Sequence, residues 1–308
     1  MKFFTRISIE PLGKPFSLSD RIMILGSCFA DSIGGKMSAA GFDVCVNPFG
    51  TLYNPESLAE AVRLLDSDRL FGPSDCVPMG AGAGRICSFR HHTSFARETA
   101  EEFLSNANAK LQQAREFWSS ANRLVLTLGT SFAWYHNGSV VANCLKRPAG
   151  EFTRRMLSVE ESAGCLSAIA SAHPGKDLLV TVSPIRHLGD GAHANAVSKA
   201  RLLLAADAIT GFAGPGCAPS DFGPYEQERG AHPGSAATVA YYFPAYEIMM
   251  DELRDYRFYA DDLFHPSTAA VDYIWERFLE SCVSPSDLDR IARNEKAARQ
   301  SAHRPNLV

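Results

Sequence analysis

Three residues of this chain could together perform acyl transfer: Ser27, His265 and Asp262. A serine hydroxyl becomes a useful nucleophile when a histidine takes its proton, and a carboxylate usually holds that histidine in one tautomer. Asp262 precedes His265 by three positions, so one loop could join carboxylate and imidazole. The same spacing is also consistent with Asp262 capping the helix that follows.

Ser27 follows an apolar run, residues 22–25, that ends at Gly26. A buried strand that turns directly into a helix can present a nucleophile, because the first helical N–H groups favour negative charge. Cys28 is a rival nucleophile that the same helix start would activate. A residue after such a turn usually points into the packing between sheet and helix, so the pattern favours Ser27 as the nucleophile and Cys28 as a core residue.

Apolar segments alternate with helical patterns along the chain. The sequence predicts strands near residues 22, 44, 125, 180 and 240, which indicates an α/β fold with a parallel sheet covered on both faces. It also predicts a short edge strand at 5–10, a hairpin at 134–143, a helix at 245–255 and a long irregular connection at 213–236. In such sheets ligands bind at the carboxyl ends of the strands, where Ser27 and Gly129 would meet.

No linker or internal repeat divides the 308 residues. The sequence therefore predicts one domain over residues 1–308, with insertions near 67–96 and 132–157 and a helical tail from about residue 284.

Several ordered motifs resemble one known family. Residues 26–30 read GSCFA, the signature that names the GSCFA family, which is similar to SGNH/GDSL-type serine hydrolases. Further matching stretches are NPFGTLYNP at 47–55, LGTS at 128–131, NC at 143–144, SPIRH at 183–187, DYRFY at 255–259 and DLFH at 262–265. The resemblance implies a three-layer α/β/α sandwich with five parallel strands, of flavodoxin-like type. It also implies Ser27 as nucleophile, His265 as base and Asp262 as its orienting partner.

The resemblance further implies an oxyanion hole. Its first donor would be the N–H of Ser27 and its second the N–H of Gly50. The third position departs from the superfamily pattern, because Ser131 stands where Gly-x-Asn would place an asparagine. Either Ser131 or Asn143 could then donate. One such donor typically contributes about 3 kcal/mol to lowering the barrier.

Other polar side chains have weaker signals. Arg186 and His187 stand at the end of a predicted strand and could bind an anionic or acyl substrate. Alternatively, Arg186 forms a salt bridge with a neighbouring acid and His187 is simply half-exposed. His91, His92 and His193 lack metal-ligand spacing and are interpreted as exposed loop residues, so neither a metal nor a cofactor is predicted.

Composition narrows the class of protein. The net charge is −4 without a run of Lys or Arg, which argues against a nucleic-acid partner. No apolar run approaches the roughly 18 residues that span a bilayer. The eight cysteines are scattered without a CxxC pair, as is typical of reduced core cysteines, and the first residues lack a secretion signal. We therefore expect a cytoplasmic protein, whose oligomeric state the sequence leaves unknown.

The leading hypothesis is a serine ester hydrolase that works through an acyl-enzyme. Its substrate would be a small-molecule or carbohydrate ester, for example an O-acetyl or other short acyl group on a sugar. One alternative is acyl transfer to a sugar hydroxyl at the same site. Another is a non-catalytic module that binds a carbohydrate or a partner on a hydrolase-like fold.

Overall fold

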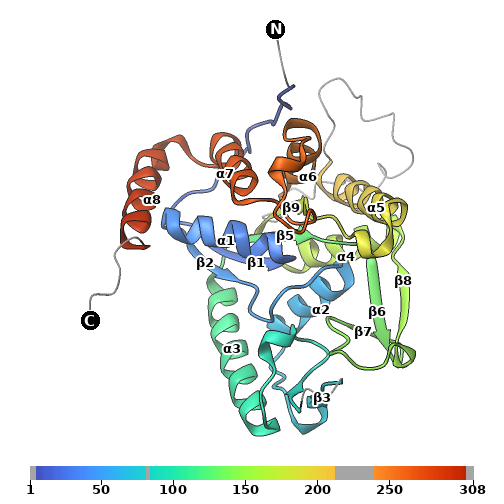
Figure 1. Cartoon of the computed structure of the whole chain (residues 1–308). Helices are drawn as coiled ribbons and strands as arrows, with labels where there is room; N and C mark the ends of the chain where they lie inside the picture. The colour runs from blue at the N-terminus through green and yellow to red at the C-terminus, as the bar shows by residue number, and fades with distance from the viewer. Residues whose placement is uncertain (1–4, 81–83, 212–238, 303–308) are drawn as a thin grey trace.

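A five-stranded, all-parallel sheet forms the centre of the computed structural model, which describes residues 5–80, 84–211 and 239–302 (Figure 1). Its strands are β1 (Arg21–Gly26), β2 (Asp43–Val46), β5 (Arg123–Leu128), β9 (Asp177–Val182) and β10 (Ala240–Tyr242). They lie in the order β2-β1-β5-β9-β10. In chain order this is second, first, third, fourth, fifth, which is the flavodoxin-like arrangement.

Helices cover both faces of the sheet, giving the predicted three-layer α/β/α sandwich. Alternate residues of β1 point to opposite faces. Ile22 and Ile24 pack with α1 (Cys28–Ala40), α7 (Thr268–Cys282) and α8 (Leu288–Ala302). Met23 and Leu25 pack with α2 (Pro55–Asp66), α3 (Ala100–Ser120), α4 (Val159–Ala172) and α5 (Ala192–Thr210). The central strands are therefore apolar on both sides, which is why they read as continuous runs.

Smaller elements lie between these. The two-stranded sheet of β3 (Val77–Pro78) and β4 (Ile86–Cys87) belongs to the first expected insertion. The three-stranded sheet of β6 (Phe132–His136), β7 (Ser139–Val141) and β8 (Thr153–Met156) belongs to the second. The short 3-10 helices are η1 (Pro73–Asp75), η2 (Thr93–Phe95), η3 (Ala149–Glu151), η4 (Leu188–Asp190), η7 (Tyr256–Phe258) and η8 (Pro285–Asp287).

Two predicted elements differ from the structure. The expected edge strand at 5–10 is irregular chain, held by side chains such as Glu252, which accepts the Ile7 N–H at 2.9 Å. The helix predicted at 245–255 is a short α6 (Ala245–Glu247) continued by the π-helical turn η6 (Ile248–Glu252). The predicted irregular connection at 213–236 lies outside the described residues.

The helical tail expected from about residue 284 is α8, which extends to Ala302. Helix α3 begins at Ala100, where Thr99 and Glu102 form a capping box. Within residues 5–80, 84–211 and 239–302, no helix combines the length and apolar character needed to cross a membrane.

Candidate active site

Gly26 makes the turn from β1 into α1. Its φ of +152° and its closeness to β5 both exclude a side chain, since a Cβ here would lie 2.3 Å from the Thr127 carbonyl oxygen. Ser27 then caps α1: its Oγ accepts the Phe29 N–H at 3.3 Å and lies 3.3 Å from Thr127 Oγ1. The Ser27 side chain is fully buried, and its own N–H donates to Thr127.

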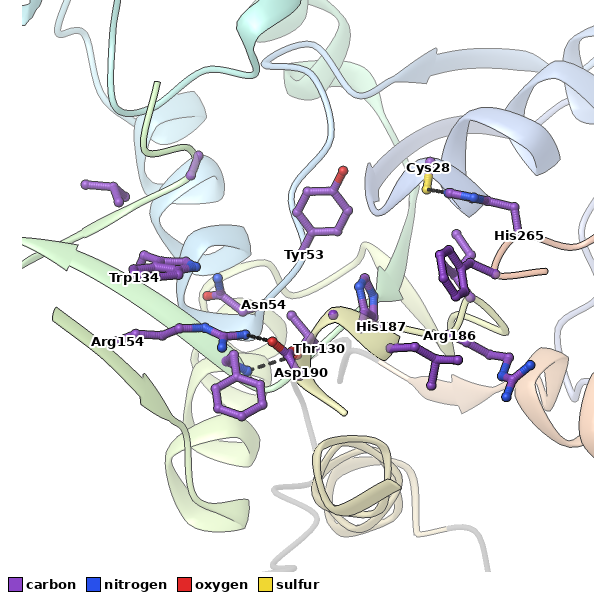
Figure 2. Close-up of a pocket in the computed structure, with 17 residues that line it drawn as sticks. Cys28, Tyr53, Asn54, Thr130, Trp134, Arg154, Arg186, His187, Asp190 and His265 are labelled. Carbon is purple, nitrogen blue, oxygen red and sulfur yellow. Dashed lines mark hydrogen bonds and ion pairs between the residues drawn. The ribbon is translucent and has the colours of Figure 1, made fainter. Parts of the chain in front are cut away.

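Cys28, the first residue of α1, lies against His265. The distance from Cys28 Sγ to His265 Nε2 is 3.4 Å (Figure 2). The predicted pairing of His265 with Ser27 is therefore not the contact that the structure contains. Ser27 is the N-cap, with an extended backbone, and Cys28 is the first helical residue, so their side chains diverge. Ser27 is fully buried beside Thr127 of β5, whereas Cys28 lines the cavity.

Asp262 holds the other nitrogen of the imidazole, as the D-x-x-H spacing predicted. Its Oδ2 lies 2.6 Å from His265 Nδ1, and its Oδ1 accepts the N–H groups of Phe264 and His265 at 2.9 and 3.0 Å. These two backbone N–H groups, with the imidazole, lower the pKa of Asp262 to about 2. The carboxylate is thus ionised at neutral pH and fits an Nδ1–H tautomer, which leaves Nε2 to accept the thiol proton.

The loop carrying these two residues is tightly closed. The Ala260 N–H donates to the His265 carbonyl at 2.8 Å, and the Ser267 N–H donates to the Phe258 carbonyl at 2.8 Å. Leu263 adopts a φ of +61°, which strains a residue with a branched side chain. This left-handed conformation turns the backbone so that the N–H groups of Phe264 and His265 both donate to Asp262.

The groups around Cys28 both raise and lower the pKa of its thiol. Burial raises the pKa of Cys28, and Asp31 adds to the rise. The N–H groups of Cys28 and Phe29, together with the charge of Lys199, lower the pKa and partly offset that effect. The nearby His265 Nε2 is the group placed to accept the proton of this thiol.

A cavity of about 430 Å³ extends from Cys28 and His265 towards the β6–β8 sheet. At its far end, the guanidinium of Arg154 lies 3.9 Å from the ring centre of Phe132 and donates to Asp190 at 2.6 Å. The remaining walls combine apolar and polar groups, among them Tyr53, Asn54, Thr130, Trp134, Ile185, Arg186, His187, Leu188 and Phe264.

A cysteine, a histidine and a carboxylate thus lie in series at the carboxyl edge of a flavodoxin-like sheet. The model of the GSCFA family matches residues 21–278. The chain belongs to the GSCFA family. No curated protein and no solved structure matches it.

The oxyanion donors expected for this family member do not line the cavity. The N–H groups of Ser27, Gly50 and Ser131 donate to Thr127, Asn47 and Ser198 instead. The φ of Gly50 is +79°, and a Cβ there would lie 2.3 Å from His92 Cβ, so this glycine serves the turn after β2. Asn143 accepts the Leu145 N–H at 2.8 Å. The geometry does not support these roles, because the polar groups are engaged elsewhere.

Arg186 and His187 both line the cavity, as an anion- or acyl-binding role would need. Arg186 packs over Tyr259 at 5.3 Å and donates to the Leu263 carbonyl at 3.3 Å, so it supports the loop of His265. Burial first, and then the charge of Lys199, lower the pKa of His187 to about 4. At neutral pH His187 is therefore an uncharged wall of the cavity.

The structure corrects the interpretation of His91 as an exposed loop residue. His91 is fully buried, and its Nδ1 lies 2.7 Å from Ser88 Oγ. Its ring packs 4.5 Å from that of Phe95, and burial lowers its pKa to about 3. Among the described residues, no three His, Cys, Asp or Glu side chains are grouped to hold a metal ion.

Lys199 was not singled out from the sequence, although it lies beside the site. It is 1% exposed on α5 and donates to the carbonyls of Gly129 and Ser183. Its spacing offered a signal, because Lys199 shares one helix face with the buried Leu202 and Ala206. A lysine on a buried face requires polar partners inside the protein.

Proposed function

We propose that this GSCFA family member hydrolyses acyl esters through a thioester on Cys28. One observation carries the proposal: Cys28 Sγ lies 3.4 Å from His265 Nε2, and Asp262 lies 2.6 Å from His265 Nδ1. A thiol, an imidazole and a carboxylate in this order are the parts of a nucleophilic acyl-transfer site.

The reaction would run in two halves. His265 Nε2 takes the Cys28 proton as the sulfur attacks the ester carbonyl carbon. The tetrahedral intermediate then collapses, the C–O bond breaks, and His265 returns the proton to the leaving alcohol. Water attacks the thioester with the help of His265, the C–S bond breaks, and the carboxylic acid leaves as the thiol is restored. Asp262 stays ionised and holds the imidazole throughout.

The start of α1 is the best-supported source of oxyanion stabilisation. Cys28 is its first residue, so the Cys28 N–H has no intrahelical acceptor, and the positive end of the helix dipole lies beside it. This N–H would donate to the oxygen that becomes negative when Cys28 attacks. The oxyanion role that the family resemblance implied for the Ser27 N–H would thus belong to the N–H of Cys28.

Ser27 remains the rival nucleophile, as the family resemblance suggested. Its fully buried Oγ already accepts the Phe29 N–H. To attack an ester, Ser27 would have to leave the helix cap and turn out of the sheet. This cost favours Cys28, whose side chain already lines the cavity.

The far end of the cavity supports a hydroxylated alcohol as part of the substrate. The charge of Arg154 is compensated by Asp190. Asn54 and Thr130 keep this wall polar but uncharged, although Asn54 Oδ1 accepts the Ser57 N–H and Thr130 Oγ1 pairs with Ser198. Trp134 offers an apolar wall. Such a mixture suits a sugar carrying an O-acetyl or other short acyl group better than a long lipid chain. The seven free cysteines of the described residues fit a reducing, cytoplasmic setting.

The test combines turnover with site-resolved labelling. We expect the protein to cleave p-nitrophenyl acetate, and iodoacetamide to label Cys28 in peptide mass spectrometry and stop turnover. Cys28→Ala should abolish turnover, whereas Ser27→Ala should retain it. Turnover that survives in Cys28→Ala and disappears in Ser27→Ala would return the role to the serine.

Product analysis separates hydrolysis from acyl transfer. With a free sugar present, a hydrolase releases carboxylic acid only, whereas a transferase also forms an acylated sugar. The same end of the cavity would hold the leaving alcohol or an acceptor sugar, so the structure fits both reactions. The products decide between hydrolysis and acyl transfer. If wild type and Cys28→Ala bind a methyl glycoside equally well and neither turns over an ester, the protein is a binding module.

A further inference from the structure

Lys199 is a buried cation beside the candidate site. Its Nζ donates to the Gly129 carbonyl at 2.6 Å and to the Ser183 carbonyl at 2.7 Å. These carbonyls follow directly after the ends of β5 and β9, at the edge of the sheet where the cavity lies. The ammonium therefore connects two neighbouring strand ends beneath the site.

Lys199 is held by uncharged hydrogen-bond partners. Among the described residues, none forms an ion pair with Lys199, and both of its hydrogen-bond acceptors are neutral carbonyls. Tyr246 of α6 presents its ring 5.9 Å from the Nζ. A buried cation without a carboxylate partner is costly, and burial accordingly lowers the pKa of Lys199. A negative charge that develops nearby would favour the protonated form of Lys199.

Gly129 connects this cation to the reactive residues. The Gly129 carbonyl accepts a hydrogen bond from Lys199. Gly129 also packs against Ser27, since a Cβ added to Gly129 would lie 3.4 Å from Ser27 Cβ. Ser27 directly precedes Cys28. The electrostatic effect is mutual: the cation lowers the pKa of Cys28, and the thiol counteracts the effect of burial, which lowers the pKa of Lys199 to about 7.

We propose that Lys199 is a positioning residue whose positive charge stabilises the negative charge that develops at Cys28 during acyl transfer. The inference rests on the proposed function, since it takes Cys28 as the nucleophile. The other groups that bear on Cys28 are Asp31 on α1, Tyr53 after β2 and His265 before α7. Asp31 opposes a negative sulfur, so Lys199 supplies the charge that offsets it.

The chain contains a matched control for this lysine. Lys176 Nζ also donates to two carbonyls, those of Trp118 and Ala121, at 2.8 and 2.5 Å. It lies just before β9, at the opposite end of the sheet from the cavity. Lys176→Met therefore removes the same kind of contact without removing charge from the site.

The first measurement is the pH dependence of Cys28 alkylation by iodoacetamide, followed by peptide mass spectrometry. We expect Lys199→Met to slow alkylation at neutral pH by about tenfold and to move its pH profile to higher pH. In the same variant, kcat/KM for p-nitrophenyl acetate should fall by about tenfold, mainly through kcat. Lys176→Met should leave the alkylation profile in place. A folded Lys199→Met protein with the wild-type profile, or an equal shift in Lys176→Met, would overturn the inference.

A second measurement uses the wild-type sequence, in case Lys199→Met does not fold. Coupling between two charges is reciprocal, so a charge fixed on Cys28 must alter the titration of Lys199. NMR of lysine labelled with ¹⁵N at Nζ would follow this titration after alkylation with iodoacetate, which adds a carboxylate, or with iodoacetamide, which does not. We expect a higher pKa of Lys199 with the carboxylate adduct. Identical titrations would refute the inference.

The two proposals can fail separately. If no ester is turned over but Cys28 alkylation still depends on Lys199, the proposed function fails and the electrostatic role of Lys199 stands. If Cys28-dependent turnover is found and Lys199→Met leaves both pH profiles unchanged, the function stands and the role of Lys199 fails.

Discussion

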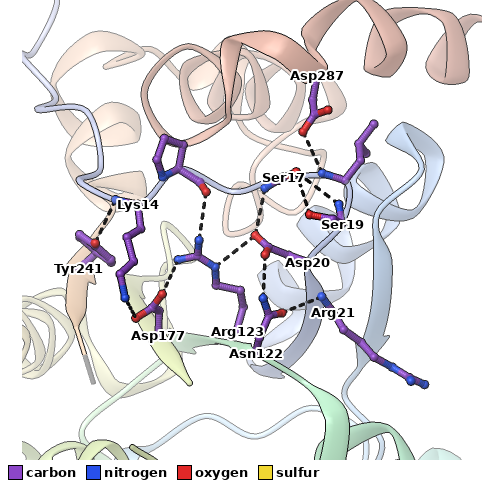
Figure 3. Close-up of polar contacts among 12 residues, drawn as sticks. Lys14, Ser17, Ser19, Asp20, Arg21, Asn122, Arg123, Asp177, Tyr241 and Asp287 are labelled. Carbon is purple, nitrogen blue, oxygen red and sulfur yellow. Dashed lines mark hydrogen bonds and ion pairs between the residues drawn. The ribbon is translucent and has the colours of Figure 1, made fainter. Parts of the chain in front are cut away.

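The two ends of the parallel sheet bury positive charge in opposite ways. At the amino end, Arg123 is held by two carboxylates, with Asp20 and Asp177 each 3.1 Å away (Figure 3). At the carboxyl end, Lys199 has only carbonyl partners among the described residues. The ion pairs of Arg123 hold the strands to the segment before β1. Lys199, in contrast, lies near Cys28, whose thiol can become negative.

The surroundings of Arg123 make the same point. Its Nη2 donates to the Pro15 carbonyl at 3.0 Å, and Asn122 donates to Asp20 at 2.8 Å. Polar atoms here bind one another and the segment before β1, and none of these residues lines the cavity. Burial of charge alone therefore does not mark a functional site. What distinguishes Lys199 is that, among the described residues, its hydrogen-bond acceptors are neutral carbonyls and no carboxylate pairs with it.

The largest effect on folding should come from the amino end. Arg123→Met leaves the buried Asp20 without its cation and Asp177 with only the exposed Lys14, so we expect a loss of about 3–5 kcal/mol in the free energy of unfolding. Urea denaturation would measure it. The matched variant is Lys14→Met, because Lys14 pairs with Asp177 from an exposed position and should contribute no more than about 1 kcal/mol. Equal losses in both variants would contradict the comparison.

At the carboxyl end, Asp262→Asn should act on the reaction. An amide cannot hold the imidazole as an ionised carboxylate does, so we expect kcat/KM for p-nitrophenyl acetate to fall roughly 100-fold. Because the pKa of Asp262 is about 2, the loss should extend over the whole neutral range of pH. Asp261→Asn, at the exposed neighbouring position, serves as the control. Similar kinetics for both variants would remove Asp262 from the proposed site.

His187 should make the carboxyl end sensitive to acid. Its folded pKa of about 4 lies below the ordinary 6.5, so between these values the unfolded chain binds the extra proton. Stability from this group is therefore lost as pH falls from 6.5 towards 4, by roughly 2 kcal/mol. His187→Gln should reduce that acid-dependent loss in urea denaturation at a series of pH values. His193→Gln, at an exposed position on α5, should leave the loss as in wild type.

The smallest effect separates Ser27 from Cys28. As the cap of α1, Ser27 should contribute about 1 kcal/mol to stability, which Ser27→Ala would lose. Ser158→Ala removes a similar cap from α4 and should cost about as much. Thermal or urea denaturation of both variants checks this, and turnover of p-nitrophenyl acetate should persist in each. Loss of turnover in Ser27→Ala alone would favour the serine.

The sequence by itself determined the architecture and half of the site. Buried strands such as β1, with its apolar run at residues 22–25, are apolar on both sides because helices cover both faces, and that pattern is readable without coordinates. The pairing of Asp262 with His265 was equally local, since one turn spans the three positions between them. The alternation of strands and helices also predicted that Ser27 and Gly129, at the ends of two strands, would meet at the carboxyl edge of the sheet.

The tertiary structure alone decided which of the two residues after Gly26, Ser27 or Cys28, contacts His265. Ser27 and Cys28 are adjacent in sequence, but Thr127 of β5 occupies the side towards which Ser27 points, and the loop before α7 occupies the other. The exposure of His91 and the partners of Lys199 were likewise set by segments distant in the chain. Local patterns fix which elements form; the direction of one side chain at a helix start depends on what packs around it.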